Sequence, residues 1–157
     1  AASDVYKRQG MAFNTASLGI NHSLAHAAGA KFHVPHGRLN SILMPHVIQY
    51  NAGIEFNNRN RQAIDKTVAI RYQDIAKLLG CSASSPVSGV RQLVEAIKKL
   101  QRKLEMPTSL REYGVKADAF AQYKVEISEA ALHDGCTPTN PRVPTAEELL
   151  KVLEKAF

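Results

Sequence analysis

Apolar residues in this chain recur at helical spacing, while the alternation of apolar and polar residues that marks a β-strand is almost absent. In the segment VRQLVEAIKKLQRKLEM, residues 90–106, one face of a helix would carry Leu93, Val94, Ile97, Leu100 and Leu104. The sequence also lacks the strand–helix alternation and the glycine-rich fingerprint of a dinucleotide-binding fold. We therefore expect an all-α domain of about seven helices.

Helix-breaking residues divide the first half of the chain. A first helix is expected over residues 11–28, ending at Gly29, because glycine is common just past a helix end. A second is expected over residues 38–51, with a kink or break at Pro45. A third ends near Gly80, and its apolar side is expected to carry Ile75, Leu78 and Leu79.

Capping residues mark the later helices. Ser85 followed by Pro86 is typical of a helix start, and Thr108 or Ser109 can cap a short helix that runs to Tyr113. A further helix is expected over residues 118–133. Thr145 and Glu148 have the spacing of a capping box, which predicts a last helix near the end of the chain.

Composition excludes several classes of protein. With 45% apolar residues the chain is not disordered, and no apolar run approaches the roughly 18–20 residues that span a bilayer. Two cysteines do not make a disulfide framework, so we expect a cytoplasmic protein. The net charge of +6 suggests nucleic acid, but the basic residues cluster on the solvent side of residues 90–106 without interleaved aromatic residues. We expect neither a nucleic-acid nor a membrane partner.

Three of the six histidines lie within NHSLAHAAGAKFHVPHG. His22 and His26 are four residues apart and share one face of the expected helix, and His36 follows in the loop after it. Neutral imidazole is a common ligand of zinc and of first-row transition metals. The spacing alone leaves two interpretations open, a metal site or a pair of partly buried, hydrogen-bonded histidines.

The sequence around these histidines resembles the iron-containing (group III) alcohol dehydrogenases. The resemblance rests on GMAFNTASLGINHSLAHAAGAKFHVPHGRLNSILMP, with its HxxAH and PHG motifs, and on DGCTPTNPRVPTAEELLKVLEKAF at the other end. It covers residues 10–157 and identifies them as the C-terminal, metal-binding helical half of a two-domain dehydrogenase. Residues 1–9, AASDVYKRQ, match nothing in that family and are expected to be an unrelated leader or a sequence artefact.

The resemblance implies roles for five residues. His22 and His36 match two of the four ligands of the family's divalent ion, Fe²⁺ or Zn²⁺. His26 matches a histidine that lines the cleft near the nicotinamide and the substrate, which implies a catalytic and cofactor-contacting role. Phe13 and Cys136 match positions in the substrate pocket. Core packing of Phe13 and a buried, inert Cys136 thiol remain as alternatives.

The function implied by the resemblance is interconversion of primary alcohols and aldehydes by hydride transfer with NAD(P). The other two metal ligands and most of the NAD(P) site would belong to an N-terminal nucleotide-binding domain that these residues do not include. The intact enzyme is then expected to form a homodimer or higher oligomer, and the isolated segment to be inactive. The alternative is a non-catalytic helical interaction or assembly domain.

Overall fold

The computed structural model describes residues 2–54 and 66–157 of the chain, and in those residues every regular element is helical. Eight α-helices are present there, against about seven expected from the sequence. The helices are α1 (Ala2–Ala16), α2 (Ile20–Phe32), α3 (His36–Asn51), α4 (Lys66–Leu78), α5 (Pro86–Lys103), α6 (Leu110–Tyr113), α7 (Ala117–Leu132) and α8 (Ala146–Lys155), with the 3₁₀ turn η2 (Thr137–Thr139) before α8.

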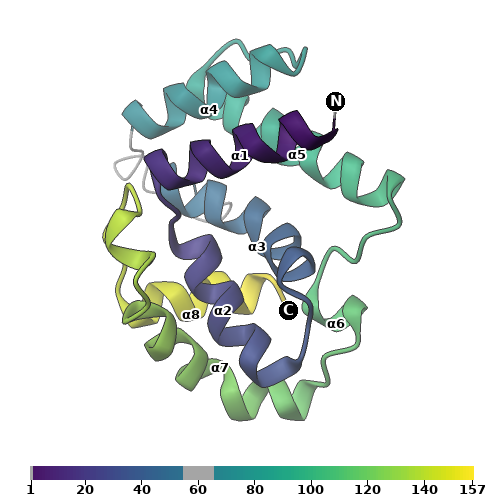
Figure 1. Ribbon diagram of the computed structural model, residues 1–157, viewed down its shortest axis with the longest axis vertical. Helices are drawn as coiled ribbons and strands as arrows, with labels where there is room; N and C mark the ends of the chain where they lie inside the picture. Colours follow the sequence, from purple (N-terminus) through teal and green to yellow (C-terminus); the bar gives the residue numbers. More distant parts are fainter. Residues whose placement is uncertain (1, 55–65) are drawn as a thin grey trace.

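The helices pack around two apolar cores that meet at α3. One core joins α3, in the middle of Figure 1, to α2, α7 and α8 below it, and it includes Leu24, Leu43 and Leu153. The other joins the end of α3 to α4 and α5, in the upper part of the view. Helix α1 crosses the molecule between these two groups and exposes most of its large apolar side chains. The all-α prediction is confirmed for the described residues.

The helix expected over residues 11–28 is wrong, because the chain breaks at residues 17–19. Ser17 takes a left-handed conformation, with φ 63°, and Gly19 is extended before the first turn of α2. The side chain of Asn140 accepts a hydrogen bond from the Ile20 N–H at 3.3 Å, so a distant loop caps α2. A Cβ on Gly19 would lie 2.6 Å from Asn140 Oδ1, which explains the need for glycine there.

Helix α1 also crosses the boundary expected after residue 9. It runs as one helix from Ala2 to Ala16, so that boundary coincides with no change in secondary structure. The division of the chain into residues 1–9 and 10–157 stays a prediction.

The apolar side expected for α4 is wrong. Ile75, Leu78 and Leu79 are exposed, and the helix instead buries its small residues Ala69 and Ala76 against α5. The reason is the close approach of the two helices, since a Cβ on Gly89 of α5 would lie 2.5 Å from the Cα of Gln73. Backbones that come this close leave no room for leucine side chains between them.

The stripe expected on α5 is confirmed only in its first half. Leu93 and Val94 are buried, whereas Leu100 and Leu104 are more than half exposed, at 55% and 61%. In the last turns of this helix it is Gln101 that is buried, against α3. The apolar spacing predicted the helix, but not how much of its length is covered by neighbouring helices.

The expected helix starts are confirmed at three places. The side chains of Ser85, Ser109 and Thr145 each accept a hydrogen bond from the backbone N–H three residues later, and Thr145 and Glu148 form the predicted capping box. Pro45 lies inside α3, which continues through it to Asn51.

Candidate metal and substrate site

Helix α2 places His22 and His26 on its solvent-facing side. Its opposite side carries Ile20, Leu24 and Ala28, which are fully buried in the first core. Because residues four apart share a helix face, the two imidazoles lie one turn apart, with ring centres 6.1 Å from each other.

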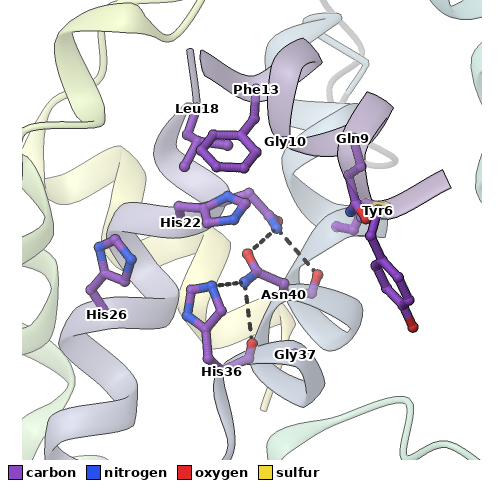
Figure 2. Close-up of a pocket in the computed structure, with 12 residues that line it drawn as sticks. Tyr6, Gln9, Gly10, Phe13, Leu18, His22, His26, His36, Gly37 and Asn40 are labelled. Carbon is purple, nitrogen blue, oxygen red and sulfur yellow. Dashed lines mark hydrogen bonds between the residues drawn. The ribbon is translucent and has the colours of Figure 1, made fainter. Parts of the chain in front are cut away.

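A short turn between α2 and α3 brings His36 close to these two histidines. His33 ends α2 in a left-handed conformation, with φ 53°, and Pro35 is the N-cap of α3. The His36 ring centre then lies 5.1 Å from that of His22 and 5.2 Å from that of His26. Figure 2 shows the three rings facing the same space from α2 and from the first turn of α3.

The three histidines line a cavity of about 680 Å³. One wall comes from α1, where Phe13 is 51% exposed and faces the cavity, so this side chain is not part of the core. Cys136 is not among the described residues that line this cavity. It lies half-buried beside Asp134, and its Sγ is within 4.8 Å of ligand atoms of His26 and Asp134.

Two asparagines that the sequence analysis missed hold His36 in place. Asn40 lies one turn after His36 on α3, and its side-chain nitrogen is 2.8 Å from His36 Nε2. The Asn21 amide donates to both Asn40 Oδ1, at 2.7 Å, and the Asn40 carbonyl, at 3.2 Å. The PHG motif did not reveal this network because Asn21 comes from another helix.

The environment of the cavity favours the neutral form of His22. Burial, followed by the neighbouring imidazoles of His36 and His26, lowers the pKa of His22 below its ordinary value. Only the neutral imidazole has a free lone pair on a ring nitrogen, so the neutral form is the one that binds metal ions.

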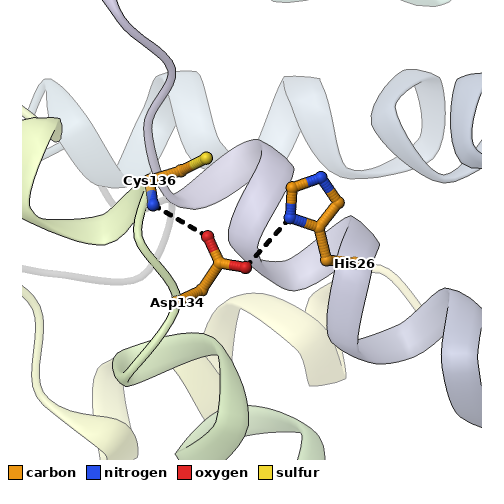
Figure 3. A group of neighbouring side chains, drawn as sticks. All are labelled: His26, Asp134 and Cys136. Atoms are coloured by element: carbon orange, nitrogen blue, oxygen red, sulfur yellow. Dashed lines mark hydrogen bonds and ion pairs between the residues drawn. The ribbon is translucent and has the colours of Figure 1, made fainter.

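Asp134 is a further residue that the sequence analysis did not assign. Its carboxylate Oδ2 lies 2.9 Å from His26 Nδ1, across 108 positions in sequence (Figure 3). Partial burial opposes ionisation, but hydrogen bonds from the Cys136 backbone and from His26 together lower the pKa of Asp134. Partial burial and the Asp134 carboxylate raise the pKa of the Cys136 thiol.

The donor set fits a divalent transition-metal ion. Two imidazoles that bind one ion tetrahedrally through bonds of about 2.1 Å have ring centres roughly 5 Å apart, close to the spacing of His22 and His36. The rings differ in their own contacts, because Nε2 of His36 lies beside the neutral Asn40 amide, whereas Nδ1 of His26 contacts a carboxylate. His26, Asp134 and Cys136 also lie close enough together to share an ion.

The fold and the cavity define a helical domain suited to bind a transition metal next to a small-molecule pocket. Comparison with known families gives a more specific result. Residues 4–157 match the model of the Fe-containing alcohol dehydrogenase family, C-terminal part, and the chain belongs to this family.

Individual relatives agree with this assignment. The chain is 37% identical to an aldehyde-alcohol dehydrogenase of Streptococcus pneumoniae, over 94% of this chain and 17% of that protein. It is 39% identical to an NADPH-dependent butanol dehydrogenase of Clostridium saccharobutylicum, over 94% of this chain and 35% of that protein. The crystal structure of a 1,3-propanediol oxidoreductase is similar with a TM-score of 0.77 and 32% identity, over 94% of this chain and 35% of that one.

The chain thus spans about a third or less of the length of these relatives. The matching family model describes the C-terminal part of such enzymes. Among the described residues, no helix combines the length and the apolar character needed to cross a membrane.

Proposed function

We propose that this chain is the metal-binding helical part of an NAD(P)-dependent alcohol dehydrogenase that interconverts primary alcohols and aldehydes. The observation that carries the proposal is the approach of His22 and His36, whose ring centres are 5.1 Å apart at one cavity. The remaining two ligands and most of the NAD(P) contacts would come from an N-terminal nucleotide-binding domain. The intact cytoplasmic enzyme would be a homodimer or a larger oligomer.

In this proposal the residues at and beside the cavity have distinct roles. His22 and His36 hold an Fe²⁺ or Zn²⁺ ion, which when bound would act as a Lewis acid on the substrate oxygen. His26 lies beside both and accepts the hydroxyl proton of the alcohol while a hydride passes from the carbinol carbon to the nicotinamide of NAD(P)⁺. Phe13 gives the substrate chain an apolar wall, and Cys136 borders the site beside Asp134. His26 also lies near the nicotinamide.

Zinc titration of the 157-residue chain tests the ligand assignment, since Zn²⁺ does not change oxidation state. We expect weak calorimetric binding by the unmodified chain, because only two protein ligands are present. His22→Ala and His36→Ala should each abolish this binding, whereas His26→Ala should retain it. His33→Asn is the matched control, because His33 is exposed in the loop between α2 and α3 and asparagine tolerates its left-handed conformation.

Two results would contradict the proposal. Equal loss of zinc binding in the His22, His26 and His36 variants would mean that the three imidazoles bind as one set. Unchanged binding in all of them would favour the alternative, a helical interaction or assembly domain. We also expect no NAD(P)-linked alcohol oxidation by the 157-residue chain alone, since it includes neither the other ligands nor the nucleotide-binding domain.

A further inference from the structure

Asp134 is held in a fixed position between the end of α7 and η2. Its Oδ1 accepts the Cys136 backbone N–H at 2.8 Å and lies 3.2 Å from the Ser23 hydroxyl on α2. Its Oδ2 is left to contact Nδ1 of His26, at 2.9 Å. Both carboxylate oxygens therefore have partners, and one of these partners is a histidine at the cavity.

The Ser23 hydroxyl that contacts Asp134 is itself anchored. Ser23 is fully buried, and its Oγ lies 2.8 Å from the hydroxyl of Thr137. The Thr137 hydroxyl is also 2.5 Å from the Ala131 carbonyl at the end of α7. Because these hydroxyls are buried, breaking any of their hydrogen bonds would destabilise the fold. The carboxylate is therefore held in place relative to both α2 and α7.

The position of the carboxylate determines which ring nitrogen of His26 carries the proton. An ionised carboxylate only accepts hydrogen bonds, and the pKa of Asp134 is lowered, so Nδ1 of His26 is the donor. In the neutral imidazole the lone pair then belongs to Nε2. Since the His26 side chain is 44% exposed and lines the cavity, Nε2 is available to a molecule bound there.

We propose that Asp134 is a positioning residue, which holds His26 in its Nδ1–H tautomer and fixes the ring so that Nε2 faces the cavity. The catalytic consequence rests on the function proposed above. There, Nε2 takes the hydroxyl proton of the alcohol as its hydride passes to NAD(P)⁺, and Asp134 remains ionised and hydrogen-bonded to the imidazolium. Carboxylates that orient histidines by this contact are common around metal and catalytic sites.

The tautomer can be measured in the 157-residue chain without any activity. Long-range ¹H–¹⁵N correlation spectra of the histidine rings distinguish protonated from unprotonated nitrogens. We expect Nδ1–H for His26 in the unmodified chain and a shift toward Nε2–H in Asp134→Ala. Asp134→Asn should largely keep Nδ1–H, because the amide oxygen can still accept the bond. Asp118→Ala removes an exposed aspartate from the other end of α7 and should change nothing.

Three results would overturn the proposal. The first is an Nε2–H tautomer in the unmodified chain. The second is an unchanged Nδ1–H tautomer in Asp134→Ala. The third is zinc binding that Cys136→Ser weakens and His36→Ala does not, because His26, Asp134 and Cys136 would then share the ion and no proton would remain on Nδ1. If Asp134→Ala fails to fold, the tautomer of His26 in the unmodified chain still tests the proposal, because an Nε2–H tautomer there would overturn it.

Kinetics separate this inference from the proposed function. In a dehydrogenase that contains this segment joined to its nucleotide-binding domain, Asp134→Ala should lower kcat on the order of 10- to 100-fold. The KM and the metal content should stay unchanged, and Asp134→Asn should recover part of kcat. Absence of any dehydrogenase activity in the unmodified enzyme would end the proposed function and leave the tautomer result intact. An unchanged kcat in Asp134→Ala would end the catalytic part of the present inference alone.

Discussion

The side-chain amide of Gln101 donates a hydrogen bond of 2.6 Å to the backbone carbonyl of Ser41. This carbonyl would normally accept the N–H of the residue four positions later in α3, which is Pro45 and has no N–H. Gln101 belongs to α5 and is buried, so it supplies the missing donor from another helix. The replacement bond explains how α3 continues through a proline that the sequence predicts as a kink or break.

Loss of the Gln101 amide should therefore cost stability. Gln101→Ala leaves the partly buried Ser41 carbonyl without this donor, and loss of a partner for a buried polar group typically costs about 1–3 kcal/mol. Urea unfolding followed by circular dichroism measures the difference in the free energy of unfolding.

A double-mutant cycle tests the explanation itself. In Pro45→Ala the new backbone N–H can bond to Ser41, so a further Gln101→Ala change should cost less than it does beside Pro45. Strictly additive effects of the two substitutions would show that Gln101 does not compensate for the proline.

Local sequence signals predicted those parts of the fold that depend on neighbouring residues. Ser85, Ser109 and Thr145 cap helices through backbone groups three positions away, and this spacing is visible in the sequence. The break before α2 depends on Asn140, more than a hundred positions later, and the sequence gives no local sign of it.

The same limit applies to the candidate site. The histidines at positions 22 and 26 share a helix face, and a short loop returns His36 to them, so their approach was predictable. Asp134 reaches His26 only because α7 packs against α2 and ends beside it. A sequence pattern within α2 contains no information about that contact.

Helices α4 and α5 pack so closely that a single methyl group added between them should destabilise the fold. In Gly89→Ala the new Cβ would lie 2.5 Å from the Cα of Gln73 and 2.6 Å from its Cβ, so the helices must separate. Overpacking of this kind costs about 1–3 kcal/mol, which should lower the unfolding midpoint.

Gly37→Ala is the matched control for this substitution. Gly37 also lies in a helix, but a Cβ there meets nothing within 4 Å. Alanine should stabilise α3 by roughly 0.5–1 kcal/mol through its higher helix propensity. If both variants shift the unfolding midpoint in the same direction, the explanation by close packing of α4 and α5 is contradicted.

Glu148 links the N-terminus of α8 to α3 and to the loop before α8. It accepts hydrogen bonds from the Thr145 backbone at 3.0 Å, the Tyr50 hydroxyl at 3.0 Å and Arg142 at 2.5 Å. Glu148→Gln removes the charge that these donors share and should destabilise the chain by roughly 2 kcal/mol at pH 7. Glu147→Gln is the control, since Glu147 is exposed and pairs with Lys151 on the surface. A loss of similar size in both variants would assign the effect to helix charge alone.

His46 gives the chain a predictable dependence on pH. Burial, with Lys98 and Lys155 nearby, lowers the pKa of His46 from 6.5 to about 4. Between these values the unfolded chain binds a proton that the folded chain does not, so the free energy of unfolding must fall as the pH drops from 6.5 to 4. The full effect is roughly 3 kcal/mol, because each tenfold change in proton affinity corresponds to about 1.4 kcal/mol.

Comparison of variants isolates this contribution from that of the carboxylates, which titrate in the same range. His46→Asn carries no titrating group, so its stability should fall less steeply than that of the unmodified chain between pH 6.5 and pH 4. The exposed His33 provides the control, because His33→Asn keeps a residue that tolerates the left-handed conformation found there. Urea midpoints at half-unit pH steps give the two slopes. Parallel curves for His46→Asn and the unmodified chain would mean that His46 has the same pKa in the folded and the unfolded chain. Burial and the two lysines would then not keep a proton off this side chain.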